Sequence, residues 1–290
     1  MSTQKTVLIT GCSTGIGASL VTAFQKRNHL VIATARNPSS LSQFSSLPNV
    51  HCLALDVTSA SSIQACVEQV GKILGDGPDD EQHHHRGGLD YVVNNAGMGY
   101  DMPVLDIDVE QAKKVYETNF WGVVRVVQGF AGLVVKAKGT VVVVATSLAY
   151  LNWPYKSTYG TSKAAVTLLA ETLRLELAPF GVKVLTIVTG GVQSDFLAKL
   201  TDVKLPETSL YRGVEKQFQS SAVMSGEKFM PTVEYAEQVV TDIVGGKEGK
   251  VWRGSNSVMA RLAVSVFPQW VIDRIVSKDT GLDQLAAMQK

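Results

Sequence analysis

Tyr159 and Lys163 are the two residues of this chain whose types and spacing best fit proton-transfer chemistry. On a helix, side chains four residues apart lie one above the other on the same face. A tyrosine hydroxyl has a pKa of about 10, and a neighbouring ammonium stabilises the ionised form and lowers that pKa. The pair therefore predicts a phenol that acts as a general acid or base. Because this spacing is also common on solvated helices, other features must support it.

A glycine-rich turn near the N-terminus is the second such feature. Residues 6–10 form an apolar, β-branched run that predicts a strand, and residues 15–27 carry apolar side chains at helical spacing. A strand, a glycine turn and a helix N-terminus together form a diphosphate site, because the backbone and its free N–H groups can approach the anion. The candidate contacts in this turn are Gly11, Ser13, Gly15, Ile16 and Gly17.

The motifs together resemble the short-chain dehydrogenase/reductase family over roughly residues 5–255. They are Gly11-x-x-x-Gly15-x-Gly17, Asn94-Asn95-Ala96-Gly97, Asn119, Ser147 and Tyr159-x-x-x-Lys163, in the order and spacing of that family. Within the family, the runs 189–194 and 205–211 and the apolar C-terminal tail resemble the fungal-type NADPH-dependent 1-acyldihydroxyacetone-phosphate reductases. The resemblance implies an oxidoreductase that acts on CH–OH and C=O groups.

The resemblance also implies a role for each member of a catalytic set. Tyr159 would donate a proton to the carbonyl oxygen while hydride reaches the carbonyl carbon, and Ser147 would hydrogen-bond the same oxygen. Lys163 would lower the pKa of Tyr159 and hold the nicotinamide ribose. Asn119 would anchor a water that leads protons to Lys163.

Further cofactor contacts are implied by position. The implied residues are Asp56 and Val57 beside the adenine, Asn95, Ala96 and Gly97 under the ribose and the centre of the cleft, and Val192 and Ser194 at the nicotinamide carboxamide. The chain departs from the usual family pattern at Thr189, where a proline is common. The backbone there is less restricted than a proline would make it.

The distribution of charge predicts which nicotinamide cofactor binds. No acidic residue precedes Asp56, and the strand-like run 30–35 is followed by Arg36. Sites selective for NAD usually place an acid at the end of this strand to bind the ribose 2′-hydroxyl. A guanidinium instead forms a forked, charge-assisted pair with a 2′-phosphate. We therefore expect NADP(H) as the cofactor.

Strand and helix patterns alternate along the chain. Apolar strand-like runs occupy 6–10, 30–35, 50–55, 89–93, 139–146, 182–188 and 249–253, and helix-length segments occupy 15–27, 61–74, 109–134, 157–178 and 234–244. This alternation predicts an α/β protein: a single doubly wound Rossmann-type domain whose parallel seven-stranded sheet has helices on both faces. We expect residues 1–255 to form this NADP-binding catalytic domain, including a substrate lid at 191–233, and residues 256–290 to extend it.

Composition excludes several other classes. Charged residues make up 18% of the chain and the net charge is +1, so no general field attracts nucleic acid. Cys12, Cys52 and Cys66 lack paired spacing, which favours a reducing compartment. The run His83–His85 predicts a solvated loop and no metal site, since adjacent residues rarely converge on one ion. The valine-rich stretch 120–135 is interrupted by polar residues and predicts a buried helix or a subunit contact.

The expected lid favours an apolar or acyl-bearing ketone as substrate, because it contains Phe196, Leu197, Leu200, Leu205, Leu210, Tyr211 and Phe218. Lys199, Lys204 and Arg212 could meet a phosphate, as 1-acyldihydroxyacetone phosphate requires. A polyketide or terpenoid ketone of a secondary pathway fits the same lid. Two hypotheses from other functional classes are a non-catalytic NADP-binding scaffold and an acyl hydrolase that uses Ser13 in G-x-S-x-G. The hydrolase would also need a histidine that activates Ser13.

The tail 258–276 predicts a peripheral membrane contact. Its apolar residues Leu262, Val266, Trp270 and Ile272 could share one face, although Pro268 should break the helix, and the flanking cations are Arg261 and Arg274. The alternative is that this tail packs on the lid or on a partner subunit of a homo-oligomer. The N-terminus lacks an apolar leader, so we expect the protein on the cytosolic side, at the endoplasmic reticulum or a lipid droplet.

Overall fold

One parallel sheet forms the centre of the protein. The computed structural model describes residues 4–75, 87–194, 196, 204–223 and 229–288. The seven strands lie in the order β3-β2-β1-β4-β5-β6-β9, and each neighbouring pair is parallel. Their bounds are β1 (Thr6–Ile9), β2 (Leu30–Ala35), β3 (Val50–Ala54), β4 (Tyr91–Asn94), β5 (Thr140–Thr146), β6 (Lys183–Thr189) and β9 (Gly249–Arg253). The order reverses between β1 and β4, where doubly wound folds bind ligands. All seven predicted strands are confirmed.

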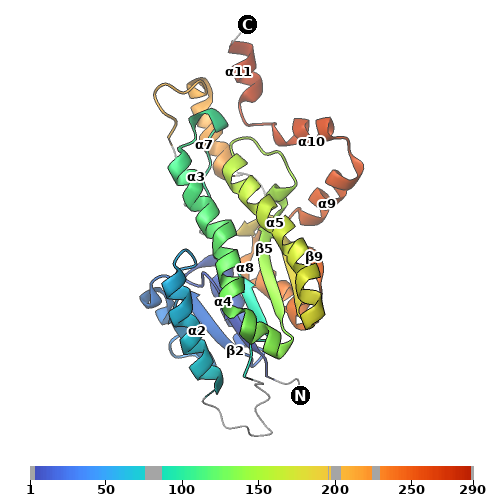
Figure 1. Ribbon diagram of the computed structural model, residues 1–290. Coiled ribbons are helices and arrows are strands. Elements are labelled where there is room, and N and C mark those ends of the chain that lie inside the picture. Colours follow the sequence, from blue (N-terminus) through green and yellow to red (C-terminus); the bar gives the residue numbers. More distant parts are fainter. Residues whose placement is uncertain (1–3, 76–86, 195, 197–203, 224–228, 289–290) are drawn as a thin grey trace.

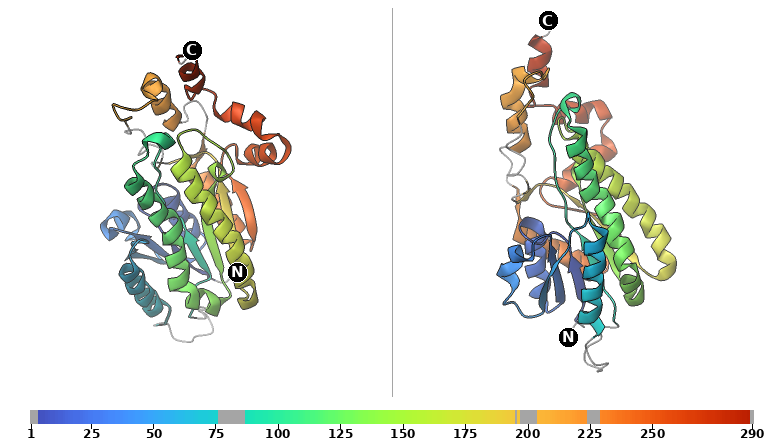
Figure 2. Two further views of the ribbon diagram at one scale, coloured as in Figure 1. Left: turned by 45° about the horizontal axis from the view of Figure 1, so that its top comes forward. Right: turned by 60° about the vertical axis from the view of Figure 1, so that its left-hand side comes forward.

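Helices cover both faces of this sheet (Figures 1 and 2). One face packs against α1 (Gly15–Gln25) and α8 (Thr232–Val244), and the other against α2 (Ala60–Gly75), α4 (Gly122–Ala137) and α5 (Ser157–Leu177). Apolar side chains of alternating strand residues fill the two cores between these layers. The prediction of a doubly wound α/β fold is confirmed.

Helix α4 continues an earlier helix through a π-helical turn. The stretch consists of α3 (Val109–Tyr116), the turn η3 (Glu117–Trp121) and α4. Among the described residues this stretch is long and apolar enough, by length and composition, to cross a membrane. Val126 and Phe130 are nevertheless fully buried against the sheet, as predicted for a core helix. The π turn interrupts the regular ladder at Asn119, and such interruptions often occur at functional sites.

A smaller apolar core lies beyond the carboxyl end of the sheet. It joins Met102 and Tyr155 to the lid residues Leu205 and Phe218 and to Leu282 of the tail. The elements around it are η6 (Arg212–Val214), α7 (Glu215–Val223) and α11 (Leu282–Met288). The short strands β7 (Val192–Gln193) and β8 (Met230–Pro231) pair with each other and pack against the core beneath α1 and α8. The remaining short helical turns are η1 (Pro38–Phe44), η2 (Val104–Asp106), η4 (Ser147–Ala149) and η5 (Ala178–Phe180).

The C-terminal tail departs in one respect from the predicted single apolar face. Helices α9 (Ser257–Val266) and α10 (Gln269–Val276) are separated at Pro268, which confirms the predicted break. Val266 and Trp270 are 70% and 69% exposed, but Ile272 is only 3% exposed. The prediction that Ile272 shares their face is wrong, because Trp270 and Ile272 are two residues apart on the same helix, α10, and therefore lie on opposite faces of it.

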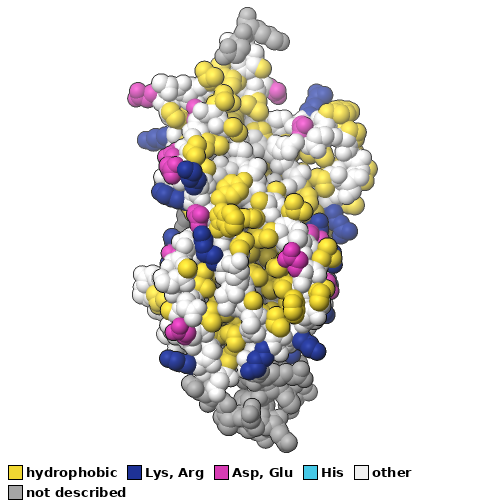
Figure 3. All heavy atoms as spheres, in the orientation of Figure 1, with side chains coloured by type: hydrophobic (Ala, Val, Ile, Leu, Met, Phe, Trp, Pro, Cys, Tyr) yellow, Lys and Arg dark blue, Asp and Glu magenta, His cyan; other side chains and the backbone are white. Residues whose placement is uncertain are grey.

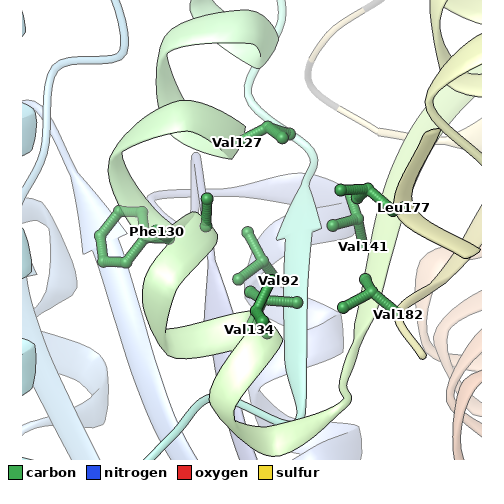
Figure 4. Close-up of a pocket in the computed structure, with 9 residues that line it drawn as sticks. Val92, Val127, Phe130, Val134, Val141, Leu177 and Val182 are labelled. Atoms are coloured by element: carbon green, nitrogen blue, oxygen red, sulfur yellow. The ribbon is translucent and has the colours of Figure 1, made fainter. Parts of the chain in front are cut away.

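A small apolar cavity of about 20 Å³ lies beneath α4 (Figure 4). Phe130 and Val134 reach it from α4, Val92 from β4 and Val141 from β5. This volume is about that of one water, and its lining offers no polar partner. The cavity is therefore a packing gap and too small to hold a substrate.

Candidate active site

The β1–α1 turn approaches the end of β4 so closely that side chains are excluded. Gly11 has a φ of +72°, and a Cβ added there would lie 2.9 Å from the Cα of Ala96. A Cβ on Gly17 would overlap the carbonyl oxygen of Gly11. Glycine is therefore required at both positions. This geometry fits the cradle that a diphosphate needs.

Two polar residues hold this turn in place. The amide of Asn95 donates to the carbonyl oxygens of Thr10 at 2.9 Å and Gly11 at 3.1 Å. The hydroxyl of Thr10 accepts from the backbone N–H groups of Asn95 and Ala96, each at 3.0 Å. The side chain of Asn95 therefore braces the turn rather than facing the cleft. Sequence reasoning missed Thr10, whose only signal was a hydroxyl residue directly before Gly11.

The start of α1 meets the segment after β6. Gly15 begins α1, and a Cβ added there would lie 3.4 Å from the Cβ of Ser194. The first turn of α1 carries no acidic residue, so its positive helix end is not neutralised from within. Ile16 is half-buried against the neighbouring core, and Val192 is buried in it. The turn and residues 192–194 thus lie close together in the structure.

The residues after β2 and β3 differ in charge and in whether their side chains already have a partner. Arg36 is exposed directly after β2, and it forms no ion pair within the described residues. Asp56 accepts hydrogen bonds from the backbone and hydroxyl of Thr58 at 2.9 and 2.8 Å. Val57 packs against Gly122, where an added Cβ would lie 2.8 Å from a Val57 methyl group. Arg36 is therefore available to an anionic ligand, while Asp56 stabilises its own turn.

Tyr159 and Lys163 lie on one face of α5. Lys163 is 5% exposed and its ammonium donates to the carbonyl oxygen of Val144 at 2.8 Å. Burial lowers the pKa of Lys163 to about 8. Burial is also the largest effect on Tyr159 and raises its pKa. Lys163 is not among the groups that shift the pKa of Tyr159, and its ammonium binds the Val144 carbonyl oxygen, so the lowering of that pKa by Lys163 stays a prediction.

The hydroxyl that contacts Tyr159 belongs to Thr146. A hydrogen bond with Thr146 lowers the pKa of Tyr159 and opposes the effect of burial. Thr146 is the last residue of β5, is 7% exposed, and accepts from the backbone N–H of Leu148 at 3.3 Å. Ser147 begins η4, and its carbonyl oxygen accepts from the N–H of Tyr150 at 3.0 Å. The role of Ser147 at the carbonyl oxygen stays a prediction, and Thr146 is a second hydroxyl residue at the same strand end.

Asn119 joins the loop after β4 to α5. Its side chain exchanges two 2.9 Å hydrogen bonds with the backbone of Met98 and donates to the Ser162 hydroxyl at 3.0 Å. A Cβ added to Gly97 would lie 3.3 Å from the Asn119 amide oxygen and 3.6 Å from the Lys163 ammonium. Gly97, Asn119 and Lys163 therefore converge, as predicted. The water-anchoring role of Asn119 stays a prediction.

A tyrosine hydroxyl supports Thr189, the residue that replaces the usual proline. The hydroxyls of Thr189 and Tyr235 lie 2.6 Å apart, and Tyr235 is fully buried on α8. The next two backbone N–H groups, of Gly190 and Gly191, donate to carbonyl oxygens of Arg253 and Ser255. These bonds restrict the segment that proline would otherwise stiffen. Tyr235 carried no signal in the sequence.

The lid places an aromatic ring on the candidate acid. The ring of Phe196 lies 5.4 Å from that of Tyr159. Leu205 and Phe218 are buried in the small core, whereas Leu210 is 70% exposed. Arg212 is 3.4 Å from Glu215 and also donates to the carbonyl oxygen of Leu205. Lys204 is exposed, and the predicted lid residues Leu197, Lys199 and Leu200 lie outside the described residues.

The geometry gives no support to a hydrolase at Ser13. His29 precedes β2 and accepts from the N–H of Lys5, whereas Ser13 follows the opposite end of β1. His51 is exposed at the start of β3, also away from that edge. His83–His85 lie outside the described residues. No group of three metal-binding side chains occurs in the part of the chain that the structure describes.

Comparison with known proteins agrees with the architecture. The family pattern described as short chain dehydrogenase matches residues 5–204. The short-chain dehydrogenase ptmH of Penicillium ochrochloron is 40% identical over 96% of this chain and 99% of that protein. The NADPH-dependent 1-acyldihydroxyacetone phosphate reductase of Schizosaccharomyces pombe is 34% identical over 92% of this chain and 93% of that protein.

A solved structure shares the fold. A short chain dehydrogenase from Burkholderia cenocepacia J2315, in complex with NADP, superposes with a TM-score of 0.73 at 22% identity, and the match covers 94% of this chain and 97% of that one. At this identity the likeness concerns the fold alone. The family pattern and the fungal relatives extend it to the sequence, and the chain belongs to the short-chain dehydrogenase family of oxidoreductases.

Proposed function

We propose that this protein is an NADPH-dependent carbonyl reductase, or in reverse an alcohol dehydrogenase, that acts on an apolar or acyl-bearing ketone. The observation that carries this proposal is the convergence at the carboxyl edge of the sheet. Lys163 and Asn119 meet at Gly97, and Tyr159, on the same face of α5, lies beneath the Phe196 ring. A proton donor under an apolar lid suits a carbonyl flanked by carbon chains.

The residues present fit NADP. Bound NADPH supplies the hydride. The turn around Gly11 and Gly17 offers backbone at close range to a diphosphate, and the exposed Arg36 can pair with a 2′-phosphate. The family relatives named NADPH-dependent support the same choice. Val192 and Ser194 are the proposed contacts at the nicotinamide end.

The chain's own residues handle the proton and the carbonyl oxygen. Tyr159 donates its proton to the oxygen as negative charge develops there. Thr146, whose hydroxyl bonds with Tyr159, hydrogen-bonds the same oxygen and orients the substrate. Lys163 holds the nicotinamide ribose and stabilises the phenolate left behind. Ser147 is the alternative to Thr146.

The substrate proposal rests on the lid. Phe196 supplies an apolar surface at Tyr159, and Arg212 is already paired with Glu215. We therefore place a ketone with a long apolar arm ahead of a small polar one. 1-Acyldihydroxyacetone phosphate is the specific candidate that the named relatives support, and the exposed Lys204 is its proposed phosphate contact. A polyketide or terpenoid ketone is the alternative.

A panel of ketones tests both statements. NADPH oxidation is followed with 1-acyldihydroxyacetone phosphate, its phosphate-free analogue and unrelated apolar ketones, and Tyr159→Phe serves as the inactive control. Turnover of apolar ketones that is lost in the control is the expected result. Equal rates with 1-acyldihydroxyacetone phosphate and its phosphate-free analogue would show that the proposed phosphate contacts are wrong. If no ketone is turned over faster than in the control, the proposed activity is wrong.

We further propose that α9 and α10 contact a lipid surface, at the endoplasmic reticulum or a lipid droplet. Val266 and Trp270 expose most of their apolar area, and the exposed cations Arg261 and Arg274 flank them and suit anionic headgroups. Trp270→Glu should abolish flotation with phosphatidylserine vesicles. Val233→Glu, which alters an exposed apolar residue of α8, should leave flotation unchanged. If the unaltered protein does not float, the contact is absent.

We also propose that a second copy of the chain covers the face of α4 and α5. Figure 3 shows apolar side chains gathered on this face. Leu168 and Leu175 of α5 are 71% and 64% exposed, and Trp121 beside α4 is 48% exposed. Sedimentation should therefore show an oligomer that the double variant Leu168→Glu/Leu175→Glu dissociates. A monomeric unaltered protein would contradict this.

A further inference from the structure

Asp101 and Lys156 form a buried ion pair that no step described so far uses. The Lys156 ammonium lies 2.5 Å from Asp101 Oδ2, and the two side chains are 5% and 2% exposed. Among the described residues, the other carboxylate oxygen of Asp101 has no hydrogen-bond partner. Burying two charges costs more desolvation free energy than packing apolar side chains in the same space. The pair therefore calls for an explanation other than stability.

The position of the pair places it beside the proton donor. Lys156 stands three residues before Tyr159, and its carbonyl oxygen accepts from the N–H of Gly160 in the first turn of α5. The loop that carries Asp101 is tied to the same point, because the N–H of Met102 donates to the carbonyl oxygen of Tyr155 at 2.8 Å. Burial raises the pKa of Tyr159 most, and the carboxylate of Asp101 adds to this increase.

The other groups that face Tyr159 are of mixed kind. Lys163 lies one turn further along α5, the Thr146 hydroxyl comes from β5, and the ring of Phe196 comes from the lid. Tyr235 faces it from α8 with its hydroxyl bonded to Thr189, and Arg253 of β9 acts on Tyr235. Asp101 is thus the negatively charged group that acts on Tyr159, and Lys156 is the cation that contacts its carboxylate.

We propose that the Asp101–Lys156 pair is a positioning device for charge around Tyr159. Asp101 favours the protonated phenol that donates to the carbonyl oxygen, and Lys156 limits this influence so that the phenol can still release its proton. The proposal rests on Tyr159 as the proton donor of the proposed function. Neither Asp101 nor Lys156 is proposed to contact the substrate or the cofactor.

Opposite changes follow from removing each partner. Asp101→Asn leaves the Lys156 cation alone and should lower the titration midpoint of Tyr159 by about one pH unit, which corresponds to about 1.4 kcal/mol of charge interaction. Lys156→Gln leaves the carboxylate uncompensated and should raise the midpoint by a similar amount. The double variant removes both charges and should titrate close to the unaltered protein. A purely structural role would not give shifts of opposite sign that cancel.

The experiment is an NMR titration of protein labelled with ¹³C at the tyrosine ring carbon that bears the hydroxyl, saturated with NADP⁺. Tyr159→Phe assigns the signal among the eight tyrosines. Asp101→Glu, which keeps the charge, should restore the unaltered midpoint. Since no ketone is used, a protein without the proposed activity can still titrate as expected, and the two failures are distinguishable.

Two outcomes overturn the proposal. One is a Tyr159 midpoint that is the same in all folded variants, including no titration in any of them. The other is a shift of the same sign in both single variants, which would indicate a common structural disturbance. If one single variant does not fold, the double variant is compared with the other single variant. The proposal requires their Tyr159 midpoints to differ, because only the single variant leaves an unbalanced charge.

Discussion

Removing the Thr146 hydroxyl should cost the enzyme far more than removing that of Ser147. Thr146→Val keeps the β-branched shape that suits the end of β5 and deletes only the hydroxyl. Thr146 is 7% exposed, so water does not replace the lost donor. A hydrogen bond to developing charge in such a site is worth roughly 3–4 kcal/mol, or about 100- to 1000-fold in kcat. Ser147→Ala should change kcat by less than about threefold.

The stability and the NADPH affinity of the Thr146→Val variant should change little. Thr146 accepts from Leu148 at 3.3 Å, so Thr146→Val should lower the free energy of unfolding by only about 1 kcal/mol. NADPH affinity, measured by fluorescence titration, should stay within twofold or so, because the hydroxyl contacts Tyr159 and not the glycine turn. Thr146→Ser should retain most of the activity. A hundredfold loss in Ser147→Ala together with a nearly active Thr146→Val would refute this reasoning and return Ser147 to the role.

Three further predictions concern charge, packing and pH. Arg36→Glu should weaken NADPH binding by roughly tenfold to a hundredfold and spare NADH, since a forked pair becomes a repulsion; similar losses for both cofactors would contradict this. Gly132→Ala should raise the free energy of unfolding by roughly 0.5–1 kcal/mol, as no atom lies within 4 Å of the new methyl group, whereas Gly129→Ala should lower it because its methyl group would meet Ile63 at 2.6 Å. Burial lowers the pKa of His29, so only the unfolded chain gains this proton as the pH falls below about 6.5; urea unfolding should show a loss of up to about 1.4 kcal/mol per pH unit that His29→Gln removes.

The fold could be predicted from the sequence because its signals are local. Each strand is a short apolar run such as 140–146, and, except between the second and the third, each is separated from the next by a helical pattern, so a parallel sheet is the arrangement that covers both faces. The glycine turn was equally readable, because Gly11 and Gly17 stand where backbone must pass close to backbone. The break in the tail was also predictable, because Pro268 lacks the N–H that a continuous helix needs.

The site was harder to predict where the answer depended on orientation rather than on spacing. Thr146 and Ser147 are adjacent hydroxyl residues, and one step along a strand end turns a side chain to the other face. A count of residues to Tyr159 cannot decide between them; the structure adds a contact of Thr146 with Tyr159, and the two variants Thr146→Val and Ser147→Ala test which hydroxyl meets the substrate. The prediction for Ile272 failed for a related reason, since a residue two positions after Trp270 on a helix lies on the opposite face.

Contacts between distant segments left no trace in the sequence at all. Asp101 and Lys156 are 55 positions apart, and Thr189 and Tyr235 are 46 apart, yet each pair adjoins the catalytic helix or the segment expected at the nicotinamide. Read singly, Asp101 is an ordinary loop acid and Tyr235 an ordinary core aromatic. Their roles arise only because the carboxyl ends of β4, β5 and β6 meet at one edge and bring their following loops together. The residues that hold the site in its shape are therefore the ones that spacing along the chain could not reveal.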